Sequence, residues 1–237
     1  MSLQTSLSMP AGHGHLESAR HSSGELLFMS ELADFSENSS IRGGVPVIAP
    51  WFSKDLGHDE LQHGWARRIQ WEVQDTTGGI DARCTHDGWD LRFSAQHTEQ
   101  GFALMLRAHN LTEYRRLIQL AFHPYFLVDD VTGTEVAGAE RRWLFDGTAT
   151  DERVATEQYS PFTISDGART LTITSQGTDH VVVWNPGAAA DENIGDLQQG
   201  DWKRFVCVEP ALLGPDSAGH SVGPEDWAAI GMTVKVS

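Results

Sequence analysis

Two apolar, strand-like segments each carry one side chain that could transfer a proton. Proline after His123 favours an extended backbone there, so this imidazole should point to one face of a sheet. Glu209 lies in the apolar run 205–211, where alternation places it on the same face as Phe205 and Cys207. A carboxylate among apolar neighbours is costly unless it is paired, so Glu209 is a functional candidate. From the local sequence alone, the alternative is that His123 is a hydrogen-bonded histidine of the core.

The irregular segment 41–71 gathers side chains that suit a small anionic ligand. Arg42 precedes a glycine pair, and Gln62, His63 and Arg67 surround a further glycine. Guanidinium groups offer forked donors that match phosphate or carboxylate oxygens, and glycine lets the backbone approach a ligand closely. The alternative is that these arginines pair with surface carboxylates, as exposed ion pairs commonly do.

A histidine and a glutamate on separate strands, beside an arginine-containing loop, suit proton transfer to and from a neutral substrate. That chemistry requires no metal, and the chain has neither the H-E-x-x-H nor the C-x-x-C spacing typical of transition-metal sites. It also lacks the Walker A and G-x-G-x-x-G phosphate loops and the G-x-S-x-G nucleophile motif. The sequence therefore predicts an acid–base site without a metal or other cofactor.

The charge balance limits the classes of partner. Asp and Glu number 33 against 17 Lys and Arg, a formal net charge of -16, so nucleic acid and anionic membranes are poor partners. The N-terminus has no signal-peptide pattern, and no stretch approaches the roughly 20 apolar residues of a membrane span. Cys84 and Cys207 lack the spacing of a disulfide framework. We expect a cytoplasmic, monomeric protein with reduced thiols.

Short segments with period-2 alternation recur about every ten residues between turn residues, a pattern typical of an antiparallel sandwich. A chain of 237 residues can form one such domain, so we expect a single domain over 1–237, with 1–23 poorly ordered or truncated. Pro46 and Pro50 should keep their segment at a sheet edge or in a loop. The expected strands cover 25–30, 69–74, 89–96, 102–110, 115–122, 133–137, 163–165, 170–175, 181–185, 205–209 and 233–236. Brief helical pieces are expected at 31–35, 191–195 and 224–229.

Five blocks, in this order, resemble the glucose-6-phosphate 1-epimerases, which are hexose-6-phosphate mutarotases of the aldose 1-epimerase superfamily. The resemblance extends from Gly24 to the C-terminus, and the order of the blocks makes it far more specific than any one of them. It implies an all-β, galactose-mutarotase-like antiparallel β-sandwich with a few short helical turns. The matching blocks are residues 41–46, 62–67, 123–126, 183–187 and 206–211.

The resemblance also implies roles for individual residues. His123 matches the family's general acid and Glu209 its general base. The chain is shorter than is usual for the family, and its N-terminal strands are expected to be missing.

The implied binding residues surround the same substrate. Arg42, Gln62 and Arg67 match positions that hold the sugar phosphate, with the arginines taking its phosphate. His63 matches a second histidine near the sugar ring in the wider superfamily, and Asp151 loosely matches a substrate-binding aspartate.

The implied reaction interconverts the α and β anomers of a hexose 6-phosphate, with glucose 6-phosphate as the expected substrate. Ionised Glu209 removes the proton from the C1 hydroxyl while protonated His123 donates one to the ring oxygen. The ring then opens, and rotation about C1–C2 precedes closure. Two alternatives remain: a sugar-binding or regulatory module without turnover, and an epimerase for unphosphorylated aldoses.

Overall fold

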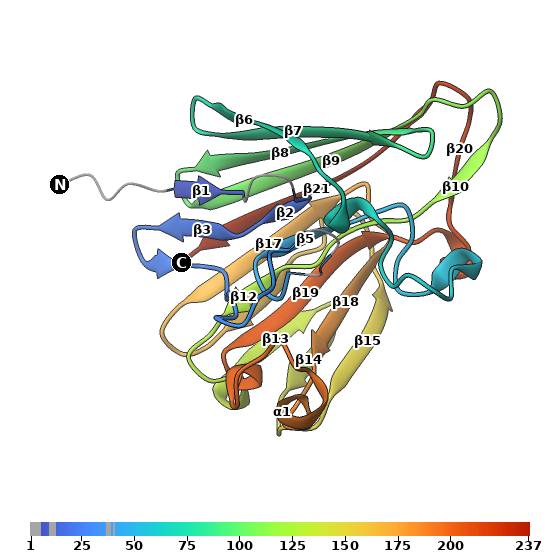
Figure 1. Cartoon of the computed structure of the whole chain (residues 1–237). Helices are drawn as coiled ribbons and strands as arrows, with labels where there is room; N and C mark the ends of the chain where they lie inside the picture. The colour runs from blue at the N-terminus through green and yellow to red at the C-terminus, as the bar shows by residue number, and fades with distance from the viewer. Residues whose placement is uncertain (1–5, 10–12, 37–38, 40) are drawn as a thin grey trace.

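Nearly all regular structure in the described residues, 6–9, 13–36, 39 and 41–237, is antiparallel β-sheet in this computed structural model (Figure 1). The smaller of two large sheets has the order β15-β18-β19-β11-β5-β2, and β12 also pairs with β19. This seven-stranded sheet contains β15 (Thr150–Ala155), β18 (His180–Asn185), β19 (Phe205–Leu212), β11 (Leu120–Phe122), β5 (Val45–Ile48), β2 (His15–Leu16) and β12 (Tyr125–Leu127).

The larger sheet has nine strands in the order β14-β13-β16-β17-β21-β9-β8-β7-β6. Its strands alternate buried and more exposed side chains, as in β9, where Leu104 and Leu106 are buried and Arg107 is exposed. The nine strands are β14 (Arg141–Leu144), β13 (Glu135–Gly138), β16 (Phe162–Ser165), β17 (Thr170–Gln176), β21 (Trp227–Val236), β9 (Gly101–Asn110), β8 (Trp89–Thr98), β7 (Gly79–His86) and β6 (Glu72–Thr76).

The two large sheets share one hydrophobic core. Phe93 of β8 and Phe122 of β11 meet edge to face with ring centroids 6.4 Å apart, and buried residues of both sheets belong to one contiguous cluster. Burial of apolar surface between two sheets is the main force that stabilises such a sandwich. The predicted galactose-mutarotase-like all-β fold is confirmed.

Two smaller sheets and short helical turns complete the fold. The small sheets contain β1 (Ser6–Ser8), β3 (Ser18–His21) and β4 (Gly24–Glu25), and β10 (Arg116–Ile118) with β20 (His220–Val222). The helical turns are α1 (Ala190–Asn193), η1 (Asp55–Gly57), η2 (Ala66–Arg68), η3 (Val131–Gly133), η4 (Asp201–Lys203) and η5 (Pro215–Ser217). Of the predicted helical pieces, the one at 191–195 overlaps α1.

The other two helix predictions are wrong. Residues 31–35 form a turn followed by irregular chain. Residues 227–229 begin β21, where Trp227 pairs with His109 of β9 and stacks on its ring with centroids 4.4 Å apart. This cross-strand stacking outweighs the weak local preference for a helix.

The expectation of a poorly ordered or truncated segment over 1–23 needs correction for its described part. Residues 6–8, 15–16 and 18–21 form strands β1, β2 and β3. Leu16 is fully buried, and β2 pairs with β5, so burial fixes this segment despite its polar composition. Residues 1–5 and 10–12 lie outside the described part of the chain.

The expectation that Pro46 lies at a sheet edge or in a loop is also wrong. β5, which contains Pro46, lies between β2 and β11. Pro46 has no N–H donor, but its carbonyl oxygen accepts a hydrogen bond from His123 N at 3.1 Å. This contact fixes the backbone of His123 against β5.

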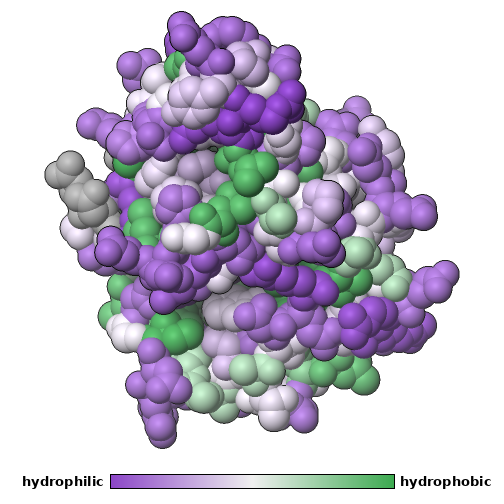
Figure 2. All heavy atoms as spheres, turned by 90° about the vertical axis from the view of Figure 1, so that its right-hand side faces the viewer, coloured by the Kyte–Doolittle hydropathy of each residue, from purple (hydrophilic) through white to green (hydrophobic). Residues whose placement is uncertain are grey.

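The surface is mainly hydrophilic on the face shown in Figure 2, where apolar atoms lie in separate patches. Large exposed apolar side chains are correspondingly scattered along the described chain, among them Leu117, Leu144 and Tyr159. No helix in the described residues has the length and apolarity needed to cross a membrane.

Candidate active site

The outer face of the seven-stranded sheet forms the floor of a cavity. The register places Arg153 of β15 opposite Val182 of β18, and Val182 opposite Glu209 of β19. The next row on the same face runs from Asp151 to Trp184. Because side chains two residues apart on a strand share a face, these five residues project together into the cavity.

The two predicted acid–base residues are in direct contact at this floor. His123 follows β11, and its Nε2 lies 3.4 Å from Glu209 Oε1. The His123 ring stacks on Tyr125 at a centroid distance of 5.0 Å and meets Trp184 edge to face at 5.6 Å. Both polar side chains are buried, and within the described chain neither His123 Nδ1 nor Glu209 Oε2 has a hydrogen-bond partner. Buried polar atoms of this kind are suited to meet a polar ligand.

Burial acts against the charged forms of Glu209 and His123 that the sequence analysis expected. Burial raises the pKa of Glu209 well above its usual range, and the nearby Asp151 carboxylate adds to the effect. Burial also lowers the pKa of His123 well below its usual range, and His63, Arg67 and Arg42 contribute in the same direction. Burial thus disfavours the charged form of each residue.

The loop after β5 forms one wall of the cavity. Two hydrogen bonds between Ser53 and His63 join the two sides of this loop. Ser53 N donates to His63 Nδ1 at 3.1 Å, while His63 N donates to Ser53 O at 2.7 Å. The first contact makes Nδ1 an acceptor, so a neutral His63 carries its proton on Nε2. Burial lowers the pKa of His63 to about 3, with Arg67 as the next cause. His63 is therefore a neutral hydrogen-bond donor at neutral pH.

Gly64 is required where this loop turns toward β5. Its φ is +67°, and a Cβ there would lie 2.0 Å from Ala49 O. The preceding Gly43 and Gly44 make similarly close approaches, since a Cβ on Gly44 would lie 2.3 Å from Leu16 O. At these glycines the close approach is to neighbouring backbone, so the approach to a ligand stays a prediction.

The two predicted anion-binding arginines have different surroundings. Arg42 Nε donates to Asp196 Oδ1 at 3.1 Å, and its Nη1 donates to Tyr125 Oη at 2.9 Å. Arg67 is buried and donates from Nη2 to Gln62 O at 3.1 Å, and no carboxylate in the described chain forms a salt bridge with it. Burial lowers the pKa of Arg67 to about 10, so it remains charged at neutral pH. A buried cation without a counter-ion is an anion-binding candidate.

All seven residues singled out in the sequence line one cavity of about 430 Å³, a volume that suits a small molecule. They are Arg42, Gln62, His63, Arg67, His123, Asp151 and Glu209. The sequence analysis did not predict several other lining residues. They include Tyr125 and Arg153. Alternation from Asp151 could have indicated Arg153.

Three donor atoms at the floor are close enough to hold a metal ion. One side-chain donor from each of His123, Cys207 and Glu209 lies within 4.8 Å of the others. However, burial raises the pKa of the Cys207 thiol well above its usual range, whereas a metal ligand must be deprotonated. The cavity also contains Arg42 and Arg67, which repel a cation. The donor set therefore fits proton transfer better than metal binding.

Comparisons with known proteins support the resemblance identified from the sequence. No family model matches the chain. A protein of Escherichia coli K12 named "Putative glucose-6-phosphate 1-epimerase" is 28% identical over 245 residues, covering 90% of this chain and 80% of its own length. A protein of the same name from Cenchrus ciliaris is 27% identical over 243 residues, covering 84% of this chain and 73% of its own.

Solved structures share the fold at lower identity. A putative mutarotase from Salmonella typhimurium has a TM-score of 0.78 at 22% identity, covering 95% of this chain and 85% of its own. A putative aldose 1-epimerase from Escherichia coli K12 has a TM-score of 0.75 at 11% identity, covering 99% of each chain. The chain is thus a homologue of proteins named as glucose-6-phosphate 1-epimerases and has the fold of mutarotases.

Proposed function

We propose that this protein interconverts the α and β anomers of a hexose 6-phosphate, with glucose 6-phosphate as the substrate. The observation that carries the proposal is the buried contact between His123 and Glu209 in the same cavity as Arg67. Arg67 is a buried cation that forms no salt bridge with a carboxylate in the described chain. An acid–base pair suits the anomeric centre, and a buried guanidinium suits the phosphate. The names of the homologues agree with this substrate.

In the proposed ring opening, Glu209 as carboxylate takes the proton of the C1 hydroxyl. The C1–O5 bond breaks as C1=O1 forms, and O5 takes the proton of the His123 imidazolium. Rotation about C1–C2 exposes the other face of the aldehyde, and closure reverses the two transfers. The enzyme holds one proton on the pair before and after each step. Positioned proton transfer of this kind contributes typically ~10²–10⁴-fold in rate.

Burial favours neutral His123 and protonated Glu209, which together are the form that follows ring opening and starts ring closure. Ring opening needs the proton on His123, and Arg67 and Arg42 are among the groups that disfavour it there. A phosphate dianion beside these arginines offsets their charge and so raises the His123 pKa. Phosphate binding would thereby favour the form that opens the ring.

Five further residues would hold and orient the substrate. Arg67, with Arg42 beside it, would bind the phosphate, and His63 would donate from Nε2 to a ring oxygen or hydroxyl. Gln62 and Asp151 are exposed polar residues of the same cavity and would contact sugar hydroxyls. No cofactor enters this mechanism.

The cellular setting is part of the proposal. Cys84 and Cys207 are both free and buried, which suits a reducing compartment. The net charge of -16 opposes binding to nucleic acid or anionic membranes. We propose a cytoplasmic monomer whose partner is a small sugar phosphate.

Exchange NMR between the two anomers tests the proposal directly. The protein should accelerate exchange of glucose 6-phosphate well above the rate in buffer, and glucose much less. Binding of glucose 6-phosphate without faster exchange would instead indicate a sugar-binding module. Equal acceleration of glucose would indicate an epimerase for unphosphorylated aldoses.

A further inference from the structure

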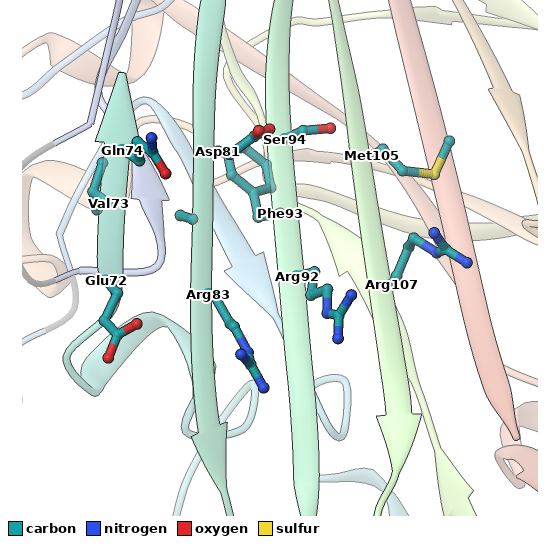
Figure 3. Close-up of a pocket in the computed structure, with 11 residues that line it drawn as sticks. Glu72, Val73, Gln74, Asp81, Arg83, Arg92, Phe93, Ser94, Met105 and Arg107 are labelled. Carbon is teal, nitrogen blue, oxygen red and sulfur yellow. The ribbon is translucent and has the colours of Figure 1, made fainter. Parts of the chain in front are cut away.

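A second hollow lies on the outer face of the nine-stranded sheet. It has a volume of about 560 Å³ and shares no lining residue with the cavity that contains His123 and Glu209. Strands β6, β7, β8 and β9 form its floor (Figure 3). A neighbouring hollow of about 320 Å³ shares Ser94 and Met105 with it and extends over β17 and β21.

Three arginines cross this floor in one row. Arg83 of β7 lies directly opposite Arg92 of β8, which in turn lies directly opposite Arg107 of β9. Figure 3 shows the three side chains on adjacent strands, with Glu72 of β6 at one end of the row. Like charges directly opposite in a sheet are destabilising. Three consecutive guanidiniums therefore need compensation, even though the protein as a whole is acidic.

Compensation within the protein is uneven along the row. Buried Asp90 accepts from Arg83 Nε at 2.8 Å and from Arg92 Nη2 at 3.0 Å. Glu72 lies opposite Arg83 and adds a second negative charge at that end. At the other end, Arg107 forms no salt bridge with any carboxylate in the described ranges. The uncompensated positive charge is therefore centred between Arg92 and Arg107.

An aromatic ring holds these last two guanidiniums in place. The Arg92 and Arg107 guanidinium carbons each lie 4.9 Å from the centroid of the Trp227 ring. His109 stacks on the same ring, nearly parallel at 3°. Cation–π contacts fix the orientation of both guanidiniums without using an N–H group as an ordinary hydrogen-bond donor. Arg92 already donates from Nε and Nη2 to Asp90, so the donors left for a ligand are its Nη1 and the Arg107 guanidinium. Such preorganised donors lower the cost of binding an anion.

We propose that Arg92 and Arg107 form a second ligand site, which binds the phosphate or other oxyanion of a small polar metabolite. The uncharged part of that molecule would lie toward the neighbouring hollow, whose floor offers hydroxyl groups from Ser94, Thr174 and Thr233. This proposal is independent of the anomer-exchange reaction, because the two cavities have no residue in common.

The charges at the rim favour a small anion over a polymer. Glu72 and Asp81 line the same hollow, so an extended polyanion across the strands would meet carboxylates. The overall charge of -16 also repels polyanions at longer range. A compact oxyanion between Arg92 and Arg107 avoids both effects.

Calorimetric titration with inorganic pyrophosphate tests the site. The wild-type protein should bind at two sites, and Arg67→Ala, which removes the buried cation of the first cavity, should retain one. Adding Arg107→Gln to Arg67→Ala should weaken the remaining binding about tenfold or more, as expected for loss of a charge-assisted hydrogen bond. Arg107→Gln is the preferred change because it leaves both Asp90 contacts intact.

Arg142→Gln is the matched control, since Arg142 is an exposed arginine on β14 of the same sheet that pairs with Glu135 at 3.2 Å. It should change neither binding event, and Arg107→Gln alone should leave anomer exchange at the wild-type rate. If Arg107→Gln lowers the melting temperature, Arg83→Gln provides a second variant and should weaken binding less, because Arg83 is already compensated. Three results would overturn the proposal: complete loss of pyrophosphate binding in Arg67→Ala, unchanged affinity in the double variant, or tighter binding of an oligoglutamate peptide than of pyrophosphate at Arg107.

Discussion

His123 Nε2 lies 3.4 Å from Glu209 Oε1, yet burial favours the uncharged form of both residues. We propose that the pair carries one proton, which passes from one residue to the other by way of the substrate in each ring opening and closure. Mutarotation requires such reversibility, because ring opening and ring closure use the two residues in opposite roles. The contact also explains why two costly polar groups share one buried location.

Replacing either partner should abolish most of the catalysis and leave binding largely intact. Glu209→Gln keeps the shape of the side chain but cannot take the C1 proton, and His123→Ala cannot protonate the ring oxygen. We expect each variant to lower anomer exchange of glucose 6-phosphate by at least ~10²-fold. Exchange NMR at saturating substrate measures the rate, and titration calorimetry measures the affinity. Exchange at the wild-type rate in either variant contradicts the assignment.

The two proposed acid–base residues could be singled out from the sequence because their local context is distinctive. His123 is followed by proline, and Glu209 interrupts an apolar strand. Their proximity could not be found from periodicity alone. It depends on two pairings of β19, with β11 and with β12, because His123 lies between these two strands and so comes opposite Glu209. Only the family resemblance indicated that the two residues share one site.

The strands that periodicity missed have weak or interrupted hydrophobic patterns. In β7 the buried positions include Ala82 and Cys84, which are small and contribute little to a hydrophobic signal. The predicted strand at 115–122 is divided at Gln119, whose buried amide donates to Leu213 O and Ser217 O. Tertiary hydrogen bonds of this kind are invisible to a local pattern.

Loss of Arg67 should weaken the binding of phosphorylated sugars much more than the binding of unphosphorylated sugars. Arg67 is buried without a carboxylate partner in the described chain, so its charge is available to a phosphate. We expect Arg67→Ala to weaken binding of glucose 6-phosphate roughly tenfold or more, corresponding to ~1.5–3 kcal/mol. Affinity for glucose should hardly change. Calorimetry with both sugars measures the difference, and equal losses for both would rule out a phosphate role.

Arg42 provides an informative comparison. Because it is engaged by Asp196 and Tyr125, Arg42→Ala should also disturb the wall of the cavity. We therefore expect Arg42→Ala to weaken the binding of both glucose 6-phosphate and glucose, with the larger loss of affinity for glucose 6-phosphate. Arg142→Ala, which removes an exposed arginine on β14, is the control for general charge effects.

Buried histidines should make the protein sensitive to mild acid. Burial is the main cause that lowers the pKa of His15 and of His63 from 6.5 to about 3, and the pKa of His123 moves in the same direction. Below about pH 6.5 the unfolded chain binds protons that the folded protein does not, so the free energy of unfolding falls with pH. Glu209, whose pKa is raised, opposes this trend by one proton above pH 4.5. A net difference of about two protons corresponds to ~3 kcal/mol for each pH unit.

Urea unfolding at pH 7, 6 and 5 measures this dependence. His63→Asn keeps an acceptor for Ser53 N and removes the titrating ring, so it should reduce the slope by about one proton. A free energy of unfolding that stays constant from pH 7 to pH 5 would show that these histidines are protonated without unfolding.

Alanine substitutions at two glycines of the loop after β5 should distinguish the cost of a steric clash from the cost of backbone strain. Gly64 and Gly57 both have positive φ, at +67° and +79°, so alanine is strained at either position. A Cβ on Gly64 would lie 2.0 Å from Ala49 O, whereas one on Gly57 would meet nothing within 4 Å. We therefore expect Gly57→Ala to cost ~1–2 kcal/mol of unfolding free energy, and Gly64→Ala to cost distinctly more because the backbone must also move.

The backbone displacement caused by Gly64→Ala should also weaken substrate binding. Gly64 directly follows His63, whose Nδ1 and N–H hold the loop to Ser53. We expect Gly64→Ala to weaken binding of glucose 6-phosphate by at least roughly tenfold at a temperature where the protein is still folded, since shifting a positioned donor is costly. Gly57→Ala should leave that affinity within about twofold, because η1 contributes no residue to the cavity lining. Urea unfolding and calorimetry on the two variants measure both effects. Equal destabilisation and equal affinity in the two would mean that the contact with Ala49 O relaxes without moving His63.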